Sequence, residues 1–255
     1  MPQIAVGNLT VNYEIRGSGH PLLMIMGLSF SLLDWGDDLP NELAKHYQVI
    51  LYDNRDAGLT TSSSVQDYTI ADVADDAAGL LQALNIKQAH VFGVSMGGMV
   101  AQQFALRHAG KLNKLVLGCT MAGGSCSVPA KLSSFTRGSL LDLLFTQSYL
   151  ADASNKRNAE DFLANTSPYH SKQEGLYRQL KAIYSHDTCN SLRTIKAPTL
   201  IITGDSDVVI PPENSDVLKQ KISGAELVPL LKDGNHGFPY SHAIETASIL
   251  INFLG

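Results

Sequence analysis

The sequence predicts an α/β protein in which helices cover both faces of a mostly parallel sheet. Short continuous apolar runs alternate with helical patterns along most of the chain, which is typical of parallel strands joined by crossover helices. An alternating segment at the N-terminus adds an antiparallel hairpin, and one long helical region interrupts the alternation. Together these observations indicate a doubly covered sheet that carries a helical insertion.

The individual strands and helices follow from the pattern of apolar residues. Residues 3–16 alternate apolar and polar side chains around a turn at Gly7-Asn8, so we expect the chain to begin with a hairpin. Each later apolar run is short, as a strand buried on both faces requires. These expected strands lie at residues 22–26, 49–52, 89–92, 115–117, 199–202 and 226–230. Helical spacing is clearest at residues 70–84 and in the last helix, which runs through Phe253.

The alternation stops between about Ser125 and Leu192. This stretch has a helical pattern and is much longer than an ordinary connecting loop. We therefore expect a core domain made of residues 1–124 and 193–255, with residues 125–192 inserted as a helical cap. Apolar residues in the cap could line a pocket or pack the cap onto the core: Leu140, Leu141, Leu143, Leu144, Phe145 and Tyr149.

Composition excludes several classes of function. The chain has 255 residues, a formal net charge of −5 and no cluster of Lys and Arg, which argues against nucleic acid as a partner. No apolar run is long enough to span a membrane, and no leader segment is evident. The three cysteines form no even framework, so we expect free thiols and a reducing cytoplasm. As partners we expect a small-molecule substrate and, at most, a second copy of the chain, in a monomer or homodimer. No metal-ligand spacing occurs, so we expect neither a metal nor an organic cofactor.

A serine flanked by glycines stands between an expected strand and an expected helix, in the run Gly93-Val94-Ser95-Met96-Gly97. A sharp strand-to-helix turn would expose the Ser95 hydroxyl and leave no room for side chains at the two glycines. The backbone N–H of Met96 would point into the same space, at the positive end of the helix. The spacing therefore predicts that Ser95 is a nucleophile.

A base and an acid for this serine are expected on two later loops. Loops at the carboxyl ends of parallel strands converge on one edge of a sheet, and His236 lies on a glycine-flanked loop after the last strand. Among the eight histidines, His242 is its nearest rival, but it starts the final helix. Asp207 follows the strand at 199–202 and would orient the imidazole, whereas Asp205 is expected to hold a turn.

Three motifs together resemble the α/β-hydrolase fold family. They are Gly93-Val94-Ser95-Met96-Gly97-Gly98, Gly204-Asp205-Ser206-Asp207 with Pro211, and Gly234-Asn235-His236. The likeness covers essentially the whole chain and implies a mostly parallel sheet of eight strands with a helical cap. It also implies Ser95 as nucleophile, Asp207 as acid and His236 as base.

The same resemblance suggests where an oxyanion would be bound. Members of the family usually have His-Gly after the third strand, and the residue after the glycine donates its N–H. This chain has Met26-Gly27, so Leu28 is the expected donor beside Met96, with Ser29 a weaker candidate. Without the histidine, we expect packing to hold this loop, through Trp35.

A second loop, Asp53-Asn54-Arg55-Asp56-Ala57-Gly58-Leu59-Thr60, matches the family pattern imperfectly. Together with Met26-Gly27, it is similar to a bacterial carboxylesterase group that includes polyketide methyl-esterase relatives. We expect Asp53 and Arg55 to form a local ion pair that braces the loop.

The expected function is hydrolysis of a small-molecule ester by a serine acyl-enzyme mechanism. The same three residues could also serve a lactonase, a carbon–carbon bond hydrolase or an aminopeptidase. An aminopeptidase would need an acidic anchor for the substrate amine, for which Glu160, Asp161 and Glu174 are available, although solvated helix faces explain these three residues better. A small-molecule receptor of the same fold is the alternative that involves no catalysis.

Overall fold

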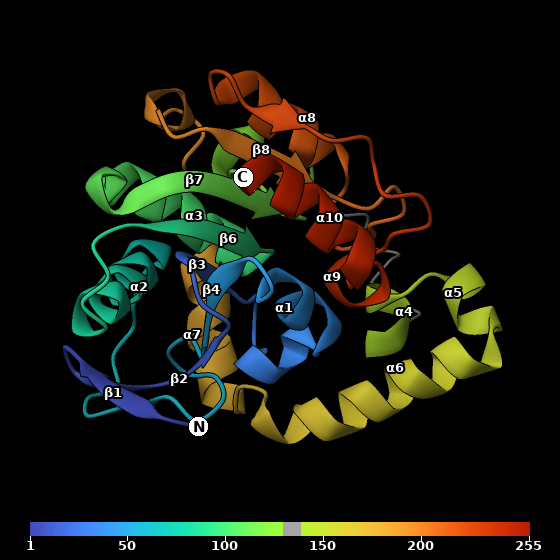
Figure 1. The fold of residues 1–255 in the computed structure, drawn as a ribbon, viewed down its shortest axis with the longest axis horizontal. Coiled ribbons are helices and arrows are strands. Elements are labelled where there is room, and N and C mark those ends of the chain that lie inside the picture. Colours follow the sequence, from blue (N-terminus) through green and yellow to red (C-terminus); the bar gives the residue numbers. More distant parts are fainter. Residues whose placement is uncertain (130–138) are drawn as a thin grey trace.

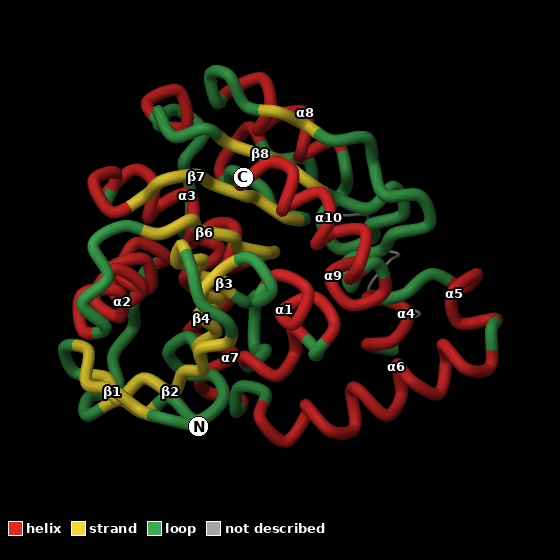
Figure 2. The backbone as a smooth tube through the Cα atoms, viewed as in Figure 1, coloured by secondary structure: helices red, strands yellow, loops and turns green. Residues whose placement is uncertain are grey.

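The computed structural model describes residues 1–129 and 139–255, and within them one sheet organises the fold. It has nine strands, with β5 (Thr61–Ser62) paired to β2 beside the main path. Along the path the order is β1 (Gln3–Val6), β2 (Leu9–Arg16), β4 (Tyr47–Tyr52), β3 (His20–Ile25), β6 (Ala89–Val94), β7 (Leu112–Gly118), β8 (Thr199–Ile202) and β9 (Glu226–Leu227). Pairing is antiparallel around β2 and parallel from β4 to β9. The predicted fold class is confirmed, and Figure 2 shows the strands side by side between helices.

Helices cover both faces of this sheet, because its central strands are apolar on both sides. In β3, Leu23 and Ile25 pack into one buried cluster, and Leu22 and Met24 pack into another. The first cluster lies under α2 (Ile70–Ala83), α3 (Met96–Arg107) and α8 (Glu213–Lys221). The second lies under α1 (Asp38–Leu43) and α10 (Ala243–Leu254). Outside the insertion the described chain also has several short helical elements: η1 (Leu32–Trp35), η2 (Ala109–Lys111), η3 (Gly124–Cys126), η6 (Leu192–Thr194) and α9 (Phe238–Ser241).

Most expected elements are found within a few residues of their predicted bounds. The helix predicted at 70–84 is α2, whose start is fixed by a capping box between Thr69 and Asp72. The strand predicted at 226–230 is shorter than expected, because β9 ends at Leu227. Pro229 follows two residues later and has no N–H with which to continue a ladder.

In the described part of the predicted cap, four helices lie between β7 and β8 in the chain. They are α4 (Leu140–Leu144), α5 (Gln147–Ala151), α6 (Ala153–Thr166) and α7 (Gln173–Tyr184), with the turn η5 (Ser167–Tyr169) before α7. Residues 130–138 of the predicted range 125–192 lie outside the described residues. Figure 1 shows α4, α5 and α6 gathered at one end of the molecule. Leu144, Phe145 and Ala159 form a small buried cluster there, against which Tyr240 of α9 packs.

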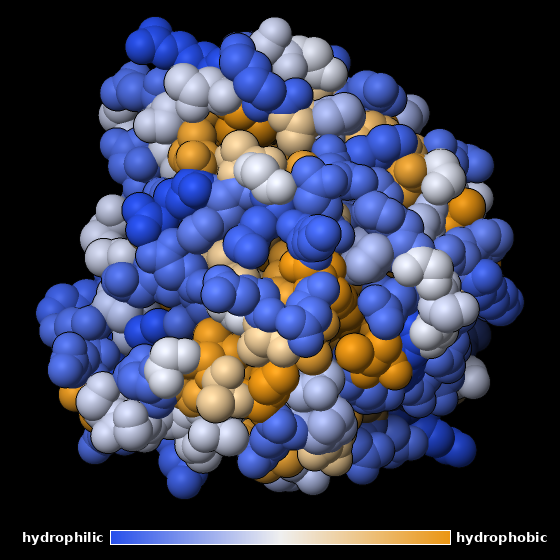
Figure 3. Space-filling view, turned by 60° about the vertical axis from the view of Figure 1, so that its left-hand side comes forward, coloured by the Kyte–Doolittle hydropathy of each residue, from blue (hydrophilic) through white to orange (hydrophobic). Residues whose placement is uncertain are grey.

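Figure 3 shows one face on which hydrophilic side chains predominate, with hydrophobic side chains gathered in a strip across its middle. None of the helices in residues 1–129 and 139–255 combines the length and the apolar character that crossing a bilayer needs.

The expectation of three free thiols is wrong, because Cys126 and Cys189 form a disulfide. Their Cα atoms are 6.0 Å apart although 63 positions separate them in the sequence. Cys126 follows β7 and Cys189 precedes β8, so the two ends of the inserted segment are brought side by side. Cys119 keeps a free, buried thiol.

The disulfide makes a prediction that counting thiols can test. Protein that is purified and denatured without reductant is expected to present one reactive thiol, that of Cys119, and three after reduction. Because the bond closes a long loop, the Cys126→Ser and Cys189→Ser variants are expected to lose about 2–4 kcal/mol of unfolding free energy. Titration with a thiol reagent and urea unfolding are the measurements. Three reactive thiols in the unreduced protein would contradict the bond.

Candidate active site

Ser95 lies on a sharp turn between β6 and α3, in a backbone conformation that few residues adopt. Its φ is 56° and its ψ is −124°. A Cβ on Gly93 would lie 2.1 Å from the carbonyl oxygen of Gly97, and one on Gly97 would lie 2.0 Å from that of Ile25. The Ser95 N–H donates to the carbonyl of Gly118 at 3.0 Å. The surrounding structure therefore imposes the strained conformation and leaves no room for other side chains at the two glycines.

The structure brings the side chains of Ser95, His236 and Asp207 together. The Ser95 Oγ lies 2.9 Å from His236 Nε2, and His236 Nδ1 lies 2.8 Å from Asp207 Oδ2. The other oxygen of Asp207 accepts the backbone N–H groups of Val209 and Ile210, each at 2.9 Å. Asp207 is buried, so the position of its carboxylate is fixed by these hydrogen bonds.

Asn235 joins the loops that carry the acid and the base, a role that sequence reasoning missed. Its buried side-chain oxygen accepts the N–H groups of Val208 and His236, at 3.2 and 2.8 Å. Its side-chain nitrogen donates to the carbonyls of Asp142 and Phe145 in the insertion. The rival histidine, His242, instead lies near the carbonyl of Lys232. Asp205 accepts the N–H of Asp233 and so holds a turn, as expected.

Opposing effects set the protonation of His236. Burial lowers the pKa of its imidazole, but the Asp207 carboxylate outweighs burial and raises the pKa well above its ordinary value. Burial raises the pKa of the Cys119 thiol, which therefore stays protonated. Cys119, Asp207 and His236 bring possible metal-ligand atoms within 4.8 Å of one another. A metal ion bound by these three side chains would have to replace the hydrogen bond between His236 and Asp207, so we assign no metal site here.

The loop after β3 lies directly beside Ser95. A Cβ on Gly27 would lie 3.0 Å from that of Ser95. Within the described residues, the N–H groups of Leu28 and Met96 donate no hydrogen bond to another residue. Both donors named from the sequence are therefore available near the serine.

Packing and hydrogen bonds together hold this loop. Trp35 is buried against Phe92, in the apolar cluster that also contains Met26 of the loop. Two hydrogen bonds hold the loop as well: Asn54 Nδ2 donates to the carbonyl of Met26 at 2.9 Å, and the Ser29 N–H donates to Gln179 Oε1 at 2.7 Å.

The expectation of an ion pair between Asp53 and Arg55 is wrong, because each of the two residues has other partners. Arg55 forms a bidentate pair with Asp76 of α2, at 2.6 and 2.7 Å. The buried Asp53 instead accepts hydrogen bonds from the N–H groups of Leu32 and Leu59 and from Asn12. Asp53 therefore holds the loop by accepting hydrogen bonds from backbone N–H groups, whereas Arg55 joins the loop to helix α2.

Ser95 lines a cavity of about 330 Å³ that lies between the core and the insertion. Its lining is mainly apolar and comes from both the core and the insertion: Met26, Leu28, Phe30, Val94, Leu140, Leu143, Leu144, Phe145, Phe162, Leu176, Val209 and Pro239. His170 is an exception, and its Nε2 lies 2.8 Å from the fully buried carboxylate of Asp34. Of the cap residues expected at a pocket, Leu141 and Tyr149 pack within the insertion instead.

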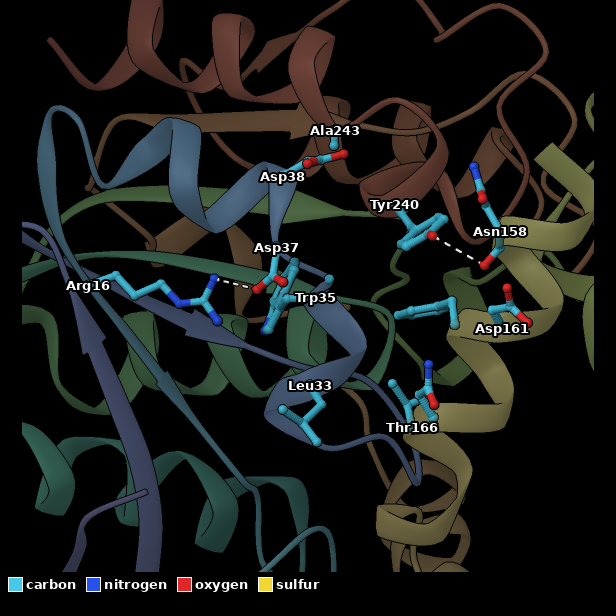
Figure 4. Close-up of a pocket in the computed structure, with 13 residues that line it drawn as sticks. Arg16, Leu33, Trp35, Asp37, Asp38, Asn158, Asp161, Thr166, Tyr240 and Ala243 are labelled. Carbon is cyan, nitrogen blue, oxygen red and sulfur yellow. Dashed lines mark hydrogen bonds and ion pairs between the residues drawn. The ribbon is translucent and has the colours of Figure 1, made fainter. Parts of the chain in front are cut away.

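A second cavity, of about 470 Å³, adjoins the first and is more polar. Phe162 and Tyr240, whose rings stack 4.2 Å apart, line both cavities. Figure 4 shows the Arg16–Asp37 pair on one side and Asn158 and Asp161 of α6 on the other. Asp161, considered as an anchor for an amine, thus lines this second cavity. Glu160 and Glu174 line neither cavity.

Comparisons with known proteins agree with this architecture. The profile of a family described as alpha/beta hydrolase fold matches residues 20–142. A protein of Pseudomonas savastanoi named "Putative carbamate hydrolase RutD" is 29% identical over 260 residues, which cover 95% of this chain and 98% of the relative. A protein of the same name from Serratia proteamaculans is 26% identical and covers 95% of each chain.

Solved structures give the same result. A hydrolase from Pseudomonas aeruginosa superposes with a TM-score of 0.86 at 26% identity, over 100% of this chain and 98% of that one. The enol-lactonase from Burkholderia xenovorans gives a TM-score of 0.82 at 27% identity, over 99% of each chain.

The charge around His236 makes a prediction that titration can test. The imidazole is expected to titrate above about 6.5, so it carries more positive charge at neutral pH than an ordinary histidine. In Asp207→Asn the carboxylate is lost while burial remains, so the pKa is expected to fall below that value. NMR titration of the ring protons measures both, and the His236→Gln variant identifies the resonance. An unchanged pKa in Asp207→Asn would contradict this account.

Proposed function

We propose that this chain, which has an α/β-hydrolase fold, is a serine hydrolase that cleaves a small to medium-sized, apolar carboxylic ester. One observation carries the proposal: a serine hydroxyl, an imidazole and a buried carboxylate form one hydrogen-bonded chain that opens into an apolar cavity. Such a chain activates an otherwise weak nucleophile.

The first step is formation of an acyl-enzyme. Ser95 Oγ attacks the ester carbonyl carbon while His236 Nε2, at 2.9 Å, accepts the hydroxyl proton. Asp207 holds the imidazole through Nδ1 and stabilises its positive charge. The N–H groups of Leu28 and Met96 stabilise the negative charge on the carbonyl oxygen. His236 then returns the proton to the leaving alcohol, and the carbon–oxygen bond breaks.

The second step releases the acid. A water molecule takes the place of the alcohol, and His236 accepts a proton from it as it attacks the acyl carbon. Collapse of this intermediate breaks the bond to Ser95 Oγ, which recovers its proton from His236. The cycle is complete without a metal or an organic cofactor.

The cavity supports an apolar substrate of limited size. Its volume of about 330 Å³ is at the small end for pockets that hold small molecules. Leu140, Leu143 and Phe145 line it from the insertion, so they contact the acyl or alcohol portion of the ester.

A carbamate or a lactone is the second candidate substrate, favoured by the relatives. The names of the curated relatives describe them as carbamate hydrolases, and one structural neighbour is an enol-lactonase. Both bond types present an acyl carbon to the serine, so the mechanism above applies to either. A small-molecule receptor of the same fold would instead bind its ligand with little or no turnover.

The Ser95→Ala variant tests whether the protein is a serine hydrolase. Wild-type protein is expected to hydrolyse p-nitrophenyl acetate and butyrate, and Ser95→Ala to lower kcat by about 10⁴-fold or more, because the nucleophile is lost. Release of p-nitrophenol is followed by absorbance, and circular dichroism verifies that the variant is folded. Equal rates in the two proteins would refute the mechanism. Binding without turnover would favour a receptor.

A substrate panel distinguishes the bond types. We expect kcat/KM for short to medium alkyl esters to exceed that for lactones, alkyl carbamates and aminoacyl amides. The substrates are matched in chain length, so that the contacts with the cavity stay similar while the type of bond changes. If kcat/KM were higher for the carbamates or the lactones than for the esters, the second candidate, and not an ester, would be the proposed substrate.

A further inference from the structure

We propose that Gln179, in helix α7 of the insertion, is a positioning residue that holds the oxyanion-binding loop in its active shape. The inference rests on the proposed serine mechanism and extends it to a residue outside the core. It means that the proposed oxyanion donors, the N–H groups of Leu28 and Met96, are correctly placed only when the insertion is docked on the core.

The side chain of Gln179 joins α7 to two loops of the core. It is 1% exposed, and both ends of its amide are bonded. Oε1 accepts the N–H of Ser29 at 2.7 Å, and Nε2 donates to the carbonyl of Arg55 at 3.0 Å. The amide thus has a fixed orientation. If its oxygen turned away from the Ser29 N–H, the hydrogen bond from Nε2 to the Arg55 carbonyl would also be lost.

Gln179 fixes one of the two peptide planes that flank the proposed donor. The Leu28 N–H belongs to the peptide between Gly27 and Leu28. On one side the peptide between Leu28 and Ser29 is held through its N–H by Gln179. On the other side the peptide between Met26 and Gly27 is held through its carbonyl by Asn54. With both neighbours held, the rotation that can redirect the Leu28 N–H is restricted to ψ of Gly27 and φ of Leu28.

Ser29 needs this support because its backbone is strained. Its φ is 70°, a value that non-glycine residues rarely adopt. Its carbonyl is held as well, by the N–H of Ser171 at 2.8 Å. Both polar backbone groups of Ser29 are therefore bonded to the insertion. Without these bonds, we expect the residue to relax toward a more favourable φ and to move the Leu28 N–H with it.

A neighbouring residue provides a matched control. Arg178 also docks α7 on the core, through a bidentate pair with Asp56 at 2.8 and 2.7 Å. It makes no hydrogen bond to the loop beside Ser95. Loss of the Arg178 pair therefore weakens docking of the helix without removing a bond from the oxyanion loop.

The test compares Gln179→Met, Gln179→Glu and Arg178→Gln in hydrolysis of p-nitrophenyl butyrate. Met has a similar length but cannot accept the Ser29 N–H, so kcat is expected to fall about ten- to a hundredfold with KM changed less than threefold. Glu keeps an acceptor for Ser29 and is expected to retain more activity than Met. Arg178→Gln is expected to keep kcat within about threefold of wild type.

A second measurement separates positioning from a general loss of structure. Binding of an alkyl trifluoromethyl ketone, which forms an oxyanion on Ser95, is expected to weaken in Gln179→Met by the same factor as kcat/KM. Binding of a neutral apolar inhibitor that does not react with Ser95 is expected to stay within threefold. If Gln179→Met does not fold, Gln179→Asn, whose amide is one methylene short of Ser29, takes its place in both measurements.

Two results would overturn the inference. One is a folded Gln179→Met (or Gln179→Asn) with kcat within threefold of wild type. The other is an equal loss of kcat in Gln179→Met and Arg178→Gln, which would assign the effect to docking alone. Both are distinct from failure of the proposed function, in which Ser95→Ala would hydrolyse the ester as fast as wild type.

Discussion

The close approach of α3 to the end of β3 constrains everything else in the site. Gly97 lies so near the carbonyl of Ile25 that no side chain fits between them, and Gly93 meets Gly97 in the same way. This contact forces the chain through a left-handed turn at Ser95 and raises its hydroxyl above the edge of the sheet. It also brings the start of α3 beside the loop that leaves β3, so Gly27 lies next to Ser95.

The other two side chains reach this space because the strands are parallel. β8 and β9 end at the same edge as β6, and the loops that follow them carry Asp207 and His236. These loops are joined to each other by Asn235, which also bonds to the insertion. The imidazole is thus oriented by hydrogen bonds that involve core and insertion together, and the charge of the buried carboxylate acts on it at short range.

Local patterns predicted the fold and the positions of the central residues, whereas long-range polar contacts escaped them. The strand at 199–202 and the helix at 70–84 depend on neighbouring residues, and their apolar spacing is sufficient to find them. Ser95, Asp207 and His236 are recognisable from glycines and strand ends nearby, although their roles remain proposals. The partner of Arg55 is Asp76, which lies 21 positions away on helix α2, and nothing in the local sequence selects it over Asp53. Gln179 has no motif around it, and the Cys126–Cys189 pairing depends on two distant segments meeting.

The disulfide at the base of the insertion has a consequence for the integrity of the chain. Any one peptide bond between Cys126 and Cys189 could be hydrolysed, and both pieces would still form one covalent molecule. The core strands on either side would remain tethered through sulfur, and reduction would be needed before the fragments could separate. A single cut within the inserted helices therefore leaves one band on a non-reducing denaturing gel and two after reduction.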